Sequence, residues 1–244
     1  MRADNAKAAA ERVLVIAAHP DDIEYSAAGS VALWIKAGAE VSYCLVTDGG
    51  SGGFGDEPRD RLRAGRLAEQ RAAAQTVGVH RCTVLGHVDG EVSAGPALRR
   101  ELAREIRLVR PTRVVCHSPE RNWARIVVSH PDHLAVGAAA LAAVYPAARN
   151  PFAFRELLDG EGLEPWVVPE VWLTGAPADR LNHFVDITEV FDIKLRALLC
   201  HRSQHPEPAN VPGRQRASAR RNAEAGGLAP DRLAEAFHLV DTRG

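Results

Sequence analysis

Two short segments of the 244-residue chain carry side chains that could bind a metal ion and move protons. The first, residues 19–24 (His-Pro-Asp-Asp-Ile-Glu), follows closely on an apolar run at residues 13–16. The second, residues 130–133 (His-Pro-Asp-His), precedes an alanine-rich stretch with helical periodicity. Imidazole and carboxylate groups without a nearby cysteine favour a borderline divalent ion such as zinc, held in an open catalytic site.

Each segment also has an ordinary structural explanation. Acidic residues in a first helical turn and a proline at a helix start are common, because both suit the N-terminus of a helix. The occurrence of two such segments favours the metal site. If Pro131 begins a helix, His130 stands just before it and His133 lies in its first turn, so both imidazoles can face one point.

The apolar run before the first segment predicts how the site is positioned. Residues 13–16 (Val-Leu-Val-Ile) favour a strand buried on both faces, as in a parallel sheet covered by helices. Ligands of such sheets bind outside the carboxyl ends of the strands. We therefore predict an α/β, Rossmann-like three-layer fold with a mostly parallel sheet and an active site at the carboxyl ends of the strands.

The remaining elements follow from the same patterns of apolar residues, glycines and prolines. The expected further strands cover residues 41–46, 82–85, 113–117, 167–173 and 183–187. The expected helices cover residues 27–37, 59–76, 97–109, 134–143 and 189–201, the last capped by Thr188 with Lys194 and Arg196 exposed. Residues 206–217 are expected to form a loop before the final helices, and the C-terminal tail is left unassigned.

The two segments resemble the signatures of the PIG-L (LmbE-like) family of zinc-dependent N-acetylglucosaminide deacetylases, which includes the mycothiol-pathway deacetylase and amidase and glycopeptide-antibiotic deacetylases. Both signatures, His-Pro-Asp-Asp-x-Glu after the first strand and His-Pro-Asp-His at a later helix start, are complete here. The resemblance extends over roughly the first 200 residues. It implies one Zn²⁺ per chain, or another divalent transition metal, held by His19, Asp22 and His133.

The resemblance also implies roles for other residues. Asp21 would be the general base and His130 would stand beside the developing tetrahedral centre, with Asp132 orienting that histidine. Glu24 would be mainly structural.

Two further residues are expected to bind substrate. Arg66 aligns with a helix arginine that reaches the sugar in the family. Asp89 is either a ligand of sugar hydroxyls or a turn aspartate ahead of Gly90.

The expected activity is that of a zinc-dependent hydrolase of linear amides. It would remove an acetyl or other short acyl group from a small N-acylated amino sugar or sugar conjugate of the N-acetylglucosamine type. One alternative is an amidase that cleaves a thiol-sugar conjugate. Another is a non-catalytic sugar-binding protein, but intact Asp21 and His130 argue against it, because binding alone needs neither a base nor an acid.

Length and composition limit the remaining possibilities. We expect one domain over residues 1–244, with a Rossmann-like core at 1–150 and a C-terminal extension of the same domain at 151–244. The chain has 30 Lys+Arg and 31 Asp+Glu, so its net charge of −1 offers no field that would attract nucleic acid or an anionic membrane. No apolar run is long enough for an integral membrane segment, and residues 1–12 do not resemble a leader, so the cytoplasm is the default location. A homo-oligomer is possible.

Several residues are ambiguous in the sequence. The glycine-rich residues 47–55 form either a rim over the metal or a plain connection, since the lysine of a phosphate-binding loop is missing. Trp123 either contacts sugar or packs its loop down. Four further histidines lack a partnered motif and are not expected to be metal ligands, namely His117, His183, His201 and His205. Four scattered cysteines, three of them in predicted strands, do not suggest disulfides.

Overall fold

The apolar runs of the sequence form a seven-stranded sheet in the order β3-β2-β1-β4-β5-β7-β6. The computed structural model describes residues 11–53 and 55–243. Strands β1 to β5 are parallel, whereas β7 is antiparallel to both β5 and β6. The strands are β1 (Arg12–Ala17), β2 (Glu40–Thr47), β3 (Arg81–His87), β4 (Arg113–His117), β5 (Glu170–Thr174), β6 (His183–Asp186) and β7 (Ala234–Asp241).

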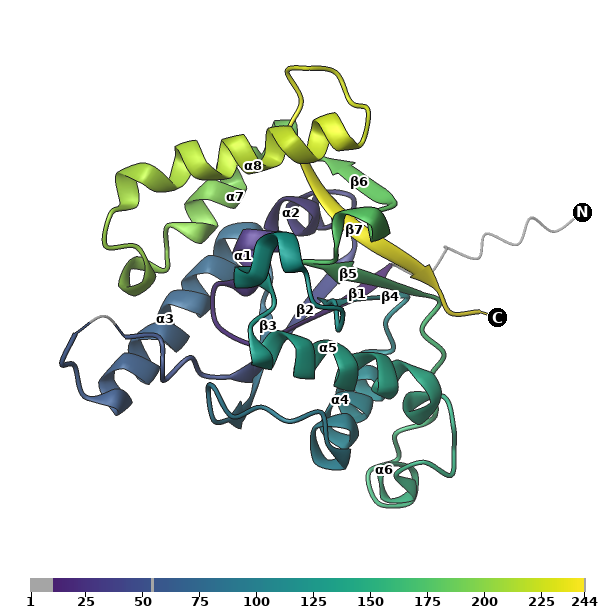
Figure 1. Ribbon diagram of the computed structural model, residues 1–244. Helices are drawn as coiled ribbons and strands as arrows, with labels where there is room; N and C mark the ends of the chain where they lie inside the picture. Colours follow the sequence, from purple (N-terminus) through teal and green to yellow (C-terminus); the bar gives the residue numbers. More distant parts are fainter. Residues whose placement is uncertain (1–10, 54, 244) are drawn as a thin grey trace, which may run out of the picture.

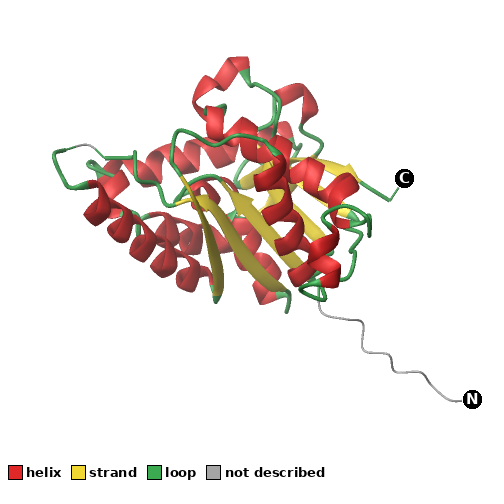
Figure 2. Cartoon of the chain, turned by 90° about the horizontal axis from the view of Figure 1, so that it is seen from below, coloured by secondary structure: helices red, strands yellow, loops and turns green. Residues whose placement is uncertain are grey.

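Helices cover both faces of this sheet, as Figures 1 and 2 show. Helices α4 and α5 pack on one face, and α2, α3 and α7 contact one another on the other. The α-helices are α1 (Asp22–Ser26), α2 (Ala28–Lys36), α3 (Arg59–Val77), α4 (Pro96–Val109), α5 (Pro131–Ala142), α6 (Arg155–Asp159), α7 (Phe191–Leu198) and α8 (Val211–Ala225). The prediction of a three-layer α/β fold with a mostly parallel sheet is confirmed.

Strand β1 is apolar from Val13 to Ala17 because helices cover it on both faces. Leu14 and Ile16 face the core shared with α4 and α5, whereas Val13, Val15 and Ala17 face the opposite core. Side chains alternate between the two faces of a strand, so a strand covered on both faces must be apolar at every position.

The order of the strands places the candidate site. Strand β1 pairs with β2 on one side and with β4 on the other, so the direction in which the sheet grows reverses at β1. A crevice opens at such a reversal, outside the carboxyl ends of the strands, and it is the usual ligand site of open α/β sheets. The first His-Pro-Asp segment follows β1 directly, and β4 ends at His117 beside it.

The C-terminal part differs from the sequence prediction in three respects. Residues 206–217 are not all loop, because α8 begins at Val211 with a proline in its first turn, where the missing N–H costs nothing. The unassigned tail forms β7, which lies between β5 and β6. Thr188 does not cap an α-helix, since its hydroxyl donates to Asp186 and α7 begins only at Phe191.

The prediction that Lys194 is exposed is wrong. Its ammonium group is buried and donates to the carbonyls of Glu24 and Tyr25 and to the carboxylate of Glu235, at 2.8, 2.9 and 2.7 Å. Glu235 lies on β7, far along the chain, and a buried ammonium is tolerated when it is paired and hydrogen-bonded in this way. Arg196, on the other face of α7, is exposed as predicted.

Some predictions concern residues that the structure does not describe, and others are not tested by it. The prediction about residues 1–12 falls mostly outside the described residues, as does Phe54 of the glycine-rich segment. The single-domain boundaries 1–244, 1–150 and 151–244 stay predictions. In residues 11–53 and 55–243, no helix combines the length and apolar character that a membrane crossing requires.

Gly137 allows α5 to approach the end of β4 closely. A Cβ atom at this position would lie 2.5 Å from the carbonyl oxygen of His117 and 2.9 Å from the nitrogen of Pro119. Both contacts are with backbone, which cannot rotate away. The missing side chain therefore sets the distance between the helix that carries His133 and the strand that carries His117.

We predict that Gly137→Ala lowers the free energy of unfolding by about 1–3 kcal/mol, because overpacking displaces a helix against backbone. Gly65→Ala is the matched control, since Gly65 lies within α3 and its Cβ would meet nothing within 4 Å. This control should raise the free energy of unfolding by about 0.5–1 kcal/mol through helix propensity. Urea denaturation measures both, and equal effects of the two variants would contradict the close approach.

Candidate metal centre

Donor atoms of three residues converge at the carboxyl end of β1. His19 Nδ1 lies 3.3 Å from His133 Nε2 and 3.4 Å from Asp22 Oδ2, and His133 Nε2 lies 3.1 Å from Asp22 Oδ1. A tetrahedral zinc ion with ligand bonds of 2.0–2.1 Å separates its donors by about 3.3 Å. The distances within this trio, 3.1 to 3.4 Å, are close to that separation, with Asp22 presenting a different oxygen to each histidine.

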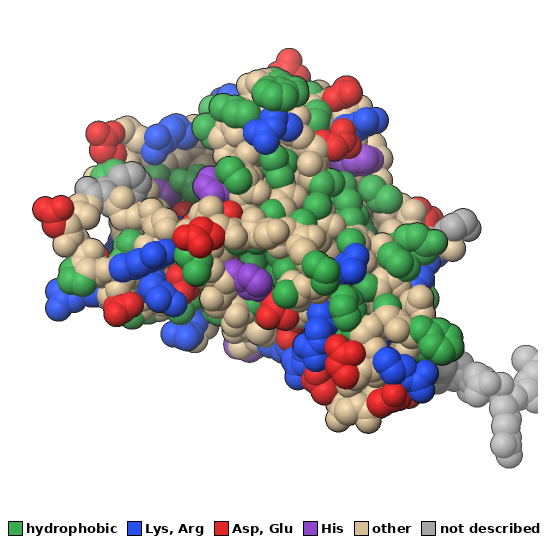
Figure 3. All heavy atoms as spheres, turned by 60° about the horizontal axis from the view of Figure 1, so that its bottom comes forward, with side chains coloured by type: hydrophobic (Ala, Val, Ile, Leu, Met, Phe, Trp, Pro, Cys, Tyr) green, Lys and Arg blue, Asp and Glu red, His purple; other side chains and the backbone are tan. Residues whose placement is uncertain are grey.

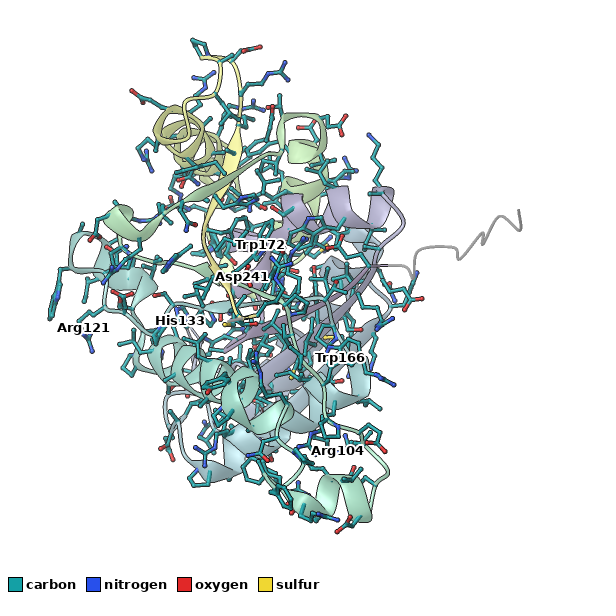
Figure 4. All side chains as sticks on the ribbon, turned by 90° about the vertical axis from the view of Figure 1, so that its right-hand side faces the viewer. Arg104, Arg121, His133, Trp166, Trp172 and Asp241 are labelled. Atoms are coloured by element: carbon teal, nitrogen blue, oxygen red, sulfur yellow. The ribbon has the colours of Figure 1, made fainter. Side chains whose placement is uncertain are left out.

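Each of the three residues is placed by a different part of the fold. His19 follows β1, Asp22 opens α1, and His133 lies in the first turn of α5. The backbone N–H of His19 donates to Asp22 Oδ2 at 2.7 Å, which closes the first segment on itself. In Figure 4, His133 lies well inside the molecule, whereas Arg121 projects outward from the loop that precedes α5.

Neighbouring oxygens fix the orientation of both imidazoles. His19 Nε2 lies 3.0 Å from Asp132 Oδ2 and 3.1 Å from Asp89 Oδ1, and His133 Nδ1 lies 3.1 Å from the carbonyl oxygen of Val128. If these nitrogens carry the protons, the lone pairs of His19 Nδ1 and His133 Nε2 point to the shared centre. Such outer hydrogen bonds are usual for histidines that bind metal.

The side chain of Asp132 has a different partner from the one expected. It contacts His19 rather than His130, and it also accepts the N–H groups of Gly90 and Val92 at 2.8 and 3.2 Å. The contact of Asp132 with His130 is made by its backbone N–H, which donates to His130 Nδ1 at 3.2 Å, and its role in orienting His130 stays a prediction. The carboxylate lies at the buried start of α5, directly opposite the end of β1, which explains why it reaches His19.

A second donor group shares His19 with the first. His19, His130 and Asp132 also have donor atoms that lie within 4.8 Å of one another. In this group His19 would use Nε2, which already contacts two carboxylates. Asp132 Oδ2 also accepts the N–H of Gly90, and His130 is exposed, so the trio of His19, Asp22 and His133 is the better candidate.

His117 was not expected near the metal, yet it belongs to the same cluster. Its ring stacks on His133 with centroids 4.1 Å apart, and its Nε2 lies 3.2 Å from Asp22 Oδ2. The same nitrogen lies 3.1 Å from the backbone nitrogen of Ala18, whose N–H donates to it. The signal in the sequence was its position as the last residue of a predicted strand, which gains meaning only when β4 is known to neighbour β1.

The charges in this cluster shift the pKa values of His19 and Asp22 in opposite directions. Burial opposes the charged form of His19, but the hydrogen bonds and charges of Asp22 and Asp89 outweigh it and raise its pKa to about 11. Burial also opposes the ionised form of Asp22, yet the charges of His133 and His117 hold its pKa well below the usual range. These carboxylates therefore create a site that attracts a cation.

Asp21 lies beside the centre but does not contribute to the donor trio. Its φ of 94° is in the left-handed region, which is uncommon for a residue with a side chain. Its N–H donates to Gln70 Oε1 at 3.0 Å, and Arg66 lies 3.3 Å from its carboxylate. Burial and the neighbouring Asp22 raise its pKa to about 7, while the Arg66 guanidinium opposes this shift.

A buried network keeps Asp21 in this conformation. Gln70 Nε2 donates to Glu24 Oε1 at 3.0 Å, and His201 Nε2 lies 3.1 Å from Glu24 Oε2. Glu24 is fully buried, in keeping with the mainly structural part expected for it. A strained residue persists when its surroundings determine its position in this way, and such residues cluster at functional sites.

His130 is the exposed member of the group. It precedes α5, and its Nδ1 accepts the N–H of Asp132 at 3.2 Å, so in the neutral ring the proton is on Nε2. Its ring centroid lies 4.9 Å from that of His19. Burial and the charge of His19 lower its pKa, which favours the neutral ring as a donor through Nε2–H.

The two residues expected to bind substrate make contacts within the protein. Arg66 is buried and donates to the carbonyls of Gly49 and Pro20 at 2.9 and 2.7 Å. Asp89 accepts the N–H of Ser51 at 2.8 Å. These contacts tie the glycine-rich segment to the first motif, and the substrate contacts of Arg66 and Asp89 stay predictions.

A cavity of about 690 Å³ opens from the metal cluster. Asp21, Asp22, His117 and His133 lie at its inner end. Residues of the turn η1 (Trp123–Val128), of α8 and of the ends of β5 and β7 form the remaining walls. The volume is within the range of about 300–1,000 Å³ that is usual for small-molecule sites.

The remaining ambiguous residues lie elsewhere. Trp123 is 81% exposed, so it does not pack its loop against the protein. His183 packs against Trp172, and His201 pairs with Glu24. His205 lies beside Tyr25, with ring centroids 5.9 Å apart.

Comparison with known proteins adds an independent line of evidence. The family model PIG-L, described as GlcNAc-PI de-N-acetylase, matches residues 14–144. A diacetylchitobiose deacetylase of Thermococcus kodakarensis is 34% identical over 200 residues, which is 81% of this chain and 71% of that protein. A probable N-acetyl-alpha-D-glucosaminyl L-malate deacetylase of Bacillus cereus is 31% identical, over 79% of this chain and 83% of the relative.

A solved structure shows the same architecture. The N,N'-diacetylchitobiose deacetylase of Pyrococcus horikoshii superposes with a TM-score of 0.86 and 29% identity. The superposition covers 96% of this chain and 85% of that one. The similarity therefore includes the C-terminal strands and helices beyond the region that the family model matches.

We predict that replacing His19, Asp22 or His133 by alanine weakens zinc binding by more than about 100-fold, because each removes a donor of the trio. Asp132→Asn should weaken it by about 10–100-fold, as expected for a residue that orients a ligand. His87→Ala is the control, since half-buried His87 pairs with Glu101 at 2.6 Å and belongs to neither donor group. Zinc titration with a competing chelator measures all five, and unchanged affinity in the three alanine variants would refute this site.

Proposed function

Because the chain belongs to the PIG-L family of de-N-acetylases, we propose that it is a zinc-dependent hydrolase that removes an acetyl or other short acyl group from an N-acylated amino sugar of the N-acetylglucosamine type. The observation that carries the proposal is the donor trio of His19, Asp22 and His133, spaced for a tetrahedral ion at the inner end of a cavity. Zinc suits this set of two imidazoles and one carboxylate.

Bound zinc would lower the pKa of a water molecule and polarise the carbonyl of the substrate acetamide. Asp21 is adjacent to Asp22 yet outside the trio, so its carboxylate is free to accept a proton from the attacking water. Burial raises the pKa of this carboxyl toward the neutral range in which a general base works.

His130 has the position and the proton for a second part in the reaction. In its neutral form, Nε2–H can donate to the oxygen of the acyl group as negative charge develops there. The leaving amine must take up a proton, and after the first step Asp21 holds one. The chain thus provides both a proton acceptor and a hydrogen-bond donor within one cluster.

Neither alternative function, the thiol-sugar conjugate amidase or the non-catalytic sugar-binding protein, has an observation of its own in its favour. The named relatives are deacetylases, and no contact in the site favours a thiol-sugar conjugate amidase. A protein that only binds sugar would not need Asp21 in a strained, buried position beside the donor trio. The cytoplasmic location and a homo-oligomeric state stay predictions of the sequence.

The neighbouring residues Asp21 and Asp22 provide a sharp test of the proposed roles. Asp21→Asn should keep zinc but lower kcat by about 100- to 10,000-fold, because the proton acceptor is lost while the donor trio is intact. Asp22→Asn is the matched substitution, and it should weaken zinc binding, because a neutral amide replaces an anionic ligand. Release of acetate from N-acetylglucosaminides, measured with the zinc content of each variant, separates the two effects.

The reverse pattern would contradict the proposal. If Asp21→Asn loses zinc while Asp22→Asn keeps both zinc and turnover, the two aspartates have exchanged roles. If wild-type protein loaded with zinc releases acetate from none of the acylated amino sugars, the deacetylase function itself is wrong.

A further inference from the structure

Three exposed arginines on two elements line the same cavity as Asp22 and His133. Arg125 comes from η1, and Arg214 and Arg221 come from α8, which lies at the top of Figure 1. In residues 11–53 and 55–243, no acidic group lies within 4.0 Å of these guanidinium groups. The acids next to them in the fold or the sequence are Glu207, which lines a neighbouring pocket with Arg214, and Glu224, which follows Arg221 by three residues on α8.

The acidic residues of the cavity do not neutralise these arginines. Asp21 and Asp22 belong to the metal cluster, and Glu235 is buried and bonded to Lys194 at 2.7 Å. The same carboxylate also accepts the N–H groups of Gly29 and Ser30. The carboxylates of Asp22 and Glu235 are therefore largely buried, whereas the three arginines that line the same cavity are exposed and form no ion pair within 4.0 Å among the described residues.

The spacing on α8 brings the polar groups of this wall together. Arg214, Ser218 and Arg221 follow one another at intervals of four and three residues, so they share one face of the helix. The two arginines are about 10 Å apart along the axis, since seven residues rise by 1.5 Å each. Arg125 on η1 adds a third guanidinium from another wall.

The three arginines form a local group of positive charge, and the protein as a whole is not basic. The net charge is −1, and on the face shown in Figure 3 acidic and basic side chains are interspersed. A guanidinium group offers a planar set of donors that matches a carboxylate or phosphate with two parallel hydrogen bonds. Uncompensated cations on the walls of a cavity also raise the local concentration of anions.

We propose that the substrate is an N-acylated amino sugar whose remote part carries a carboxylate or phosphate group, and that Arg125, Arg214 and Arg221 select this anion. The inference rests on the proposed deacetylase function, which places the acyl group at the metal cluster. It extends that function by assigning the part of the cavity that these arginines line to a negatively charged aglycone.

Binding of the deacetylated products tests the inference without turnover. The zinc-loaded protein would be titrated calorimetrically with glucosamine glycosides that carry a methyl, a carboxyalkyl or a phosphoalkyl group. We expect the anionic products to bind at least about tenfold more tightly than the methyl glycoside at low salt, and this preference should shrink as salt rises. The tighter of the two anionic products identifies the kind of anion.

Substitutions then assign the preference to named residues. Arg221→Gln and Arg214→Gln should each reduce the affinity for the anionic products by about tenfold and leave the methyl glycoside unaffected. Arg220→Gln is the matched control, because Arg220 is exposed on the same helix and does not line the cavity. Arg221→Glu should reverse the preference in favour of an aminoalkyl glycoside.

Two results would overturn the inference. One is equal affinity of wild-type protein for the neutral and anionic products, and the other is an equal loss for both classes in Arg221→Gln. Acetate release from the neutral and anionic acetylated glycosides separates this outcome from failure of the proposed function. Turnover without an anion preference refutes only the anion site, whereas anion preference in binding without turnover of any substrate refutes only the deacetylase.

Discussion

Asp22 is a buried anion, and much of the surrounding structure brings to it groups that can offset its charge, either as protonated imidazoles or as ligands of a shared cation. Its oxygens contact His19, His117 and His133, which come from the end of β1, the end of β4 and the start of α5. A carboxylate at this depth is costly without partners. The pairing of β1 with β4 and the close packing of α5 at Gly137 provide them, so fold and site depend on the same contacts.

A second layer of buried polar groups holds the residue beside that anion. Asp21 is kept in a strained conformation by Gln70, and Gln70 is held by Glu24, which is held in turn by His201. The carbonyl of Glu24 also accepts a hydrogen bond from Lys194, which is neutralised by Glu235 on β7. The C-terminal part of the chain therefore helps to position the first motif, although none of its residues belongs to the donor trio.

Features that depend on residues close together in the chain, such as single strands and short motifs, could be predicted from the sequence. The strand at residues 113–117 was predicted from its apolar run. The donors His19, Asp22 and His133 were predicted from the resemblance of two short motifs to a family signature, and the structure brings their donor atoms within 4.8 Å of one another. His117 could not be found in this way, because its contact with Asp22 requires knowledge of which strands pair. Lys194 was misjudged for the same reason, since the partner that permits its burial, Glu235, lies 41 residues further along the chain. Strand β7 lacks a pattern that distinguishes it, because its antiparallel pairing with β5 and β6 is decided by the whole sheet.

The central claim is that one ion is held by His19 Nδ1, Asp22 and His133 Nε2. The competing group of His19, His130 and Asp132 would place the ion on the other side of the His19 ring. Anomalous scattering at the zinc edge, from crystals of the zinc-loaded protein, distinguishes these positions directly. We expect a single peak at about 2.0–2.2 Å from the three donor atoms. A peak beside His19 Nε2 and Asp132, or none near His19, would contradict the account.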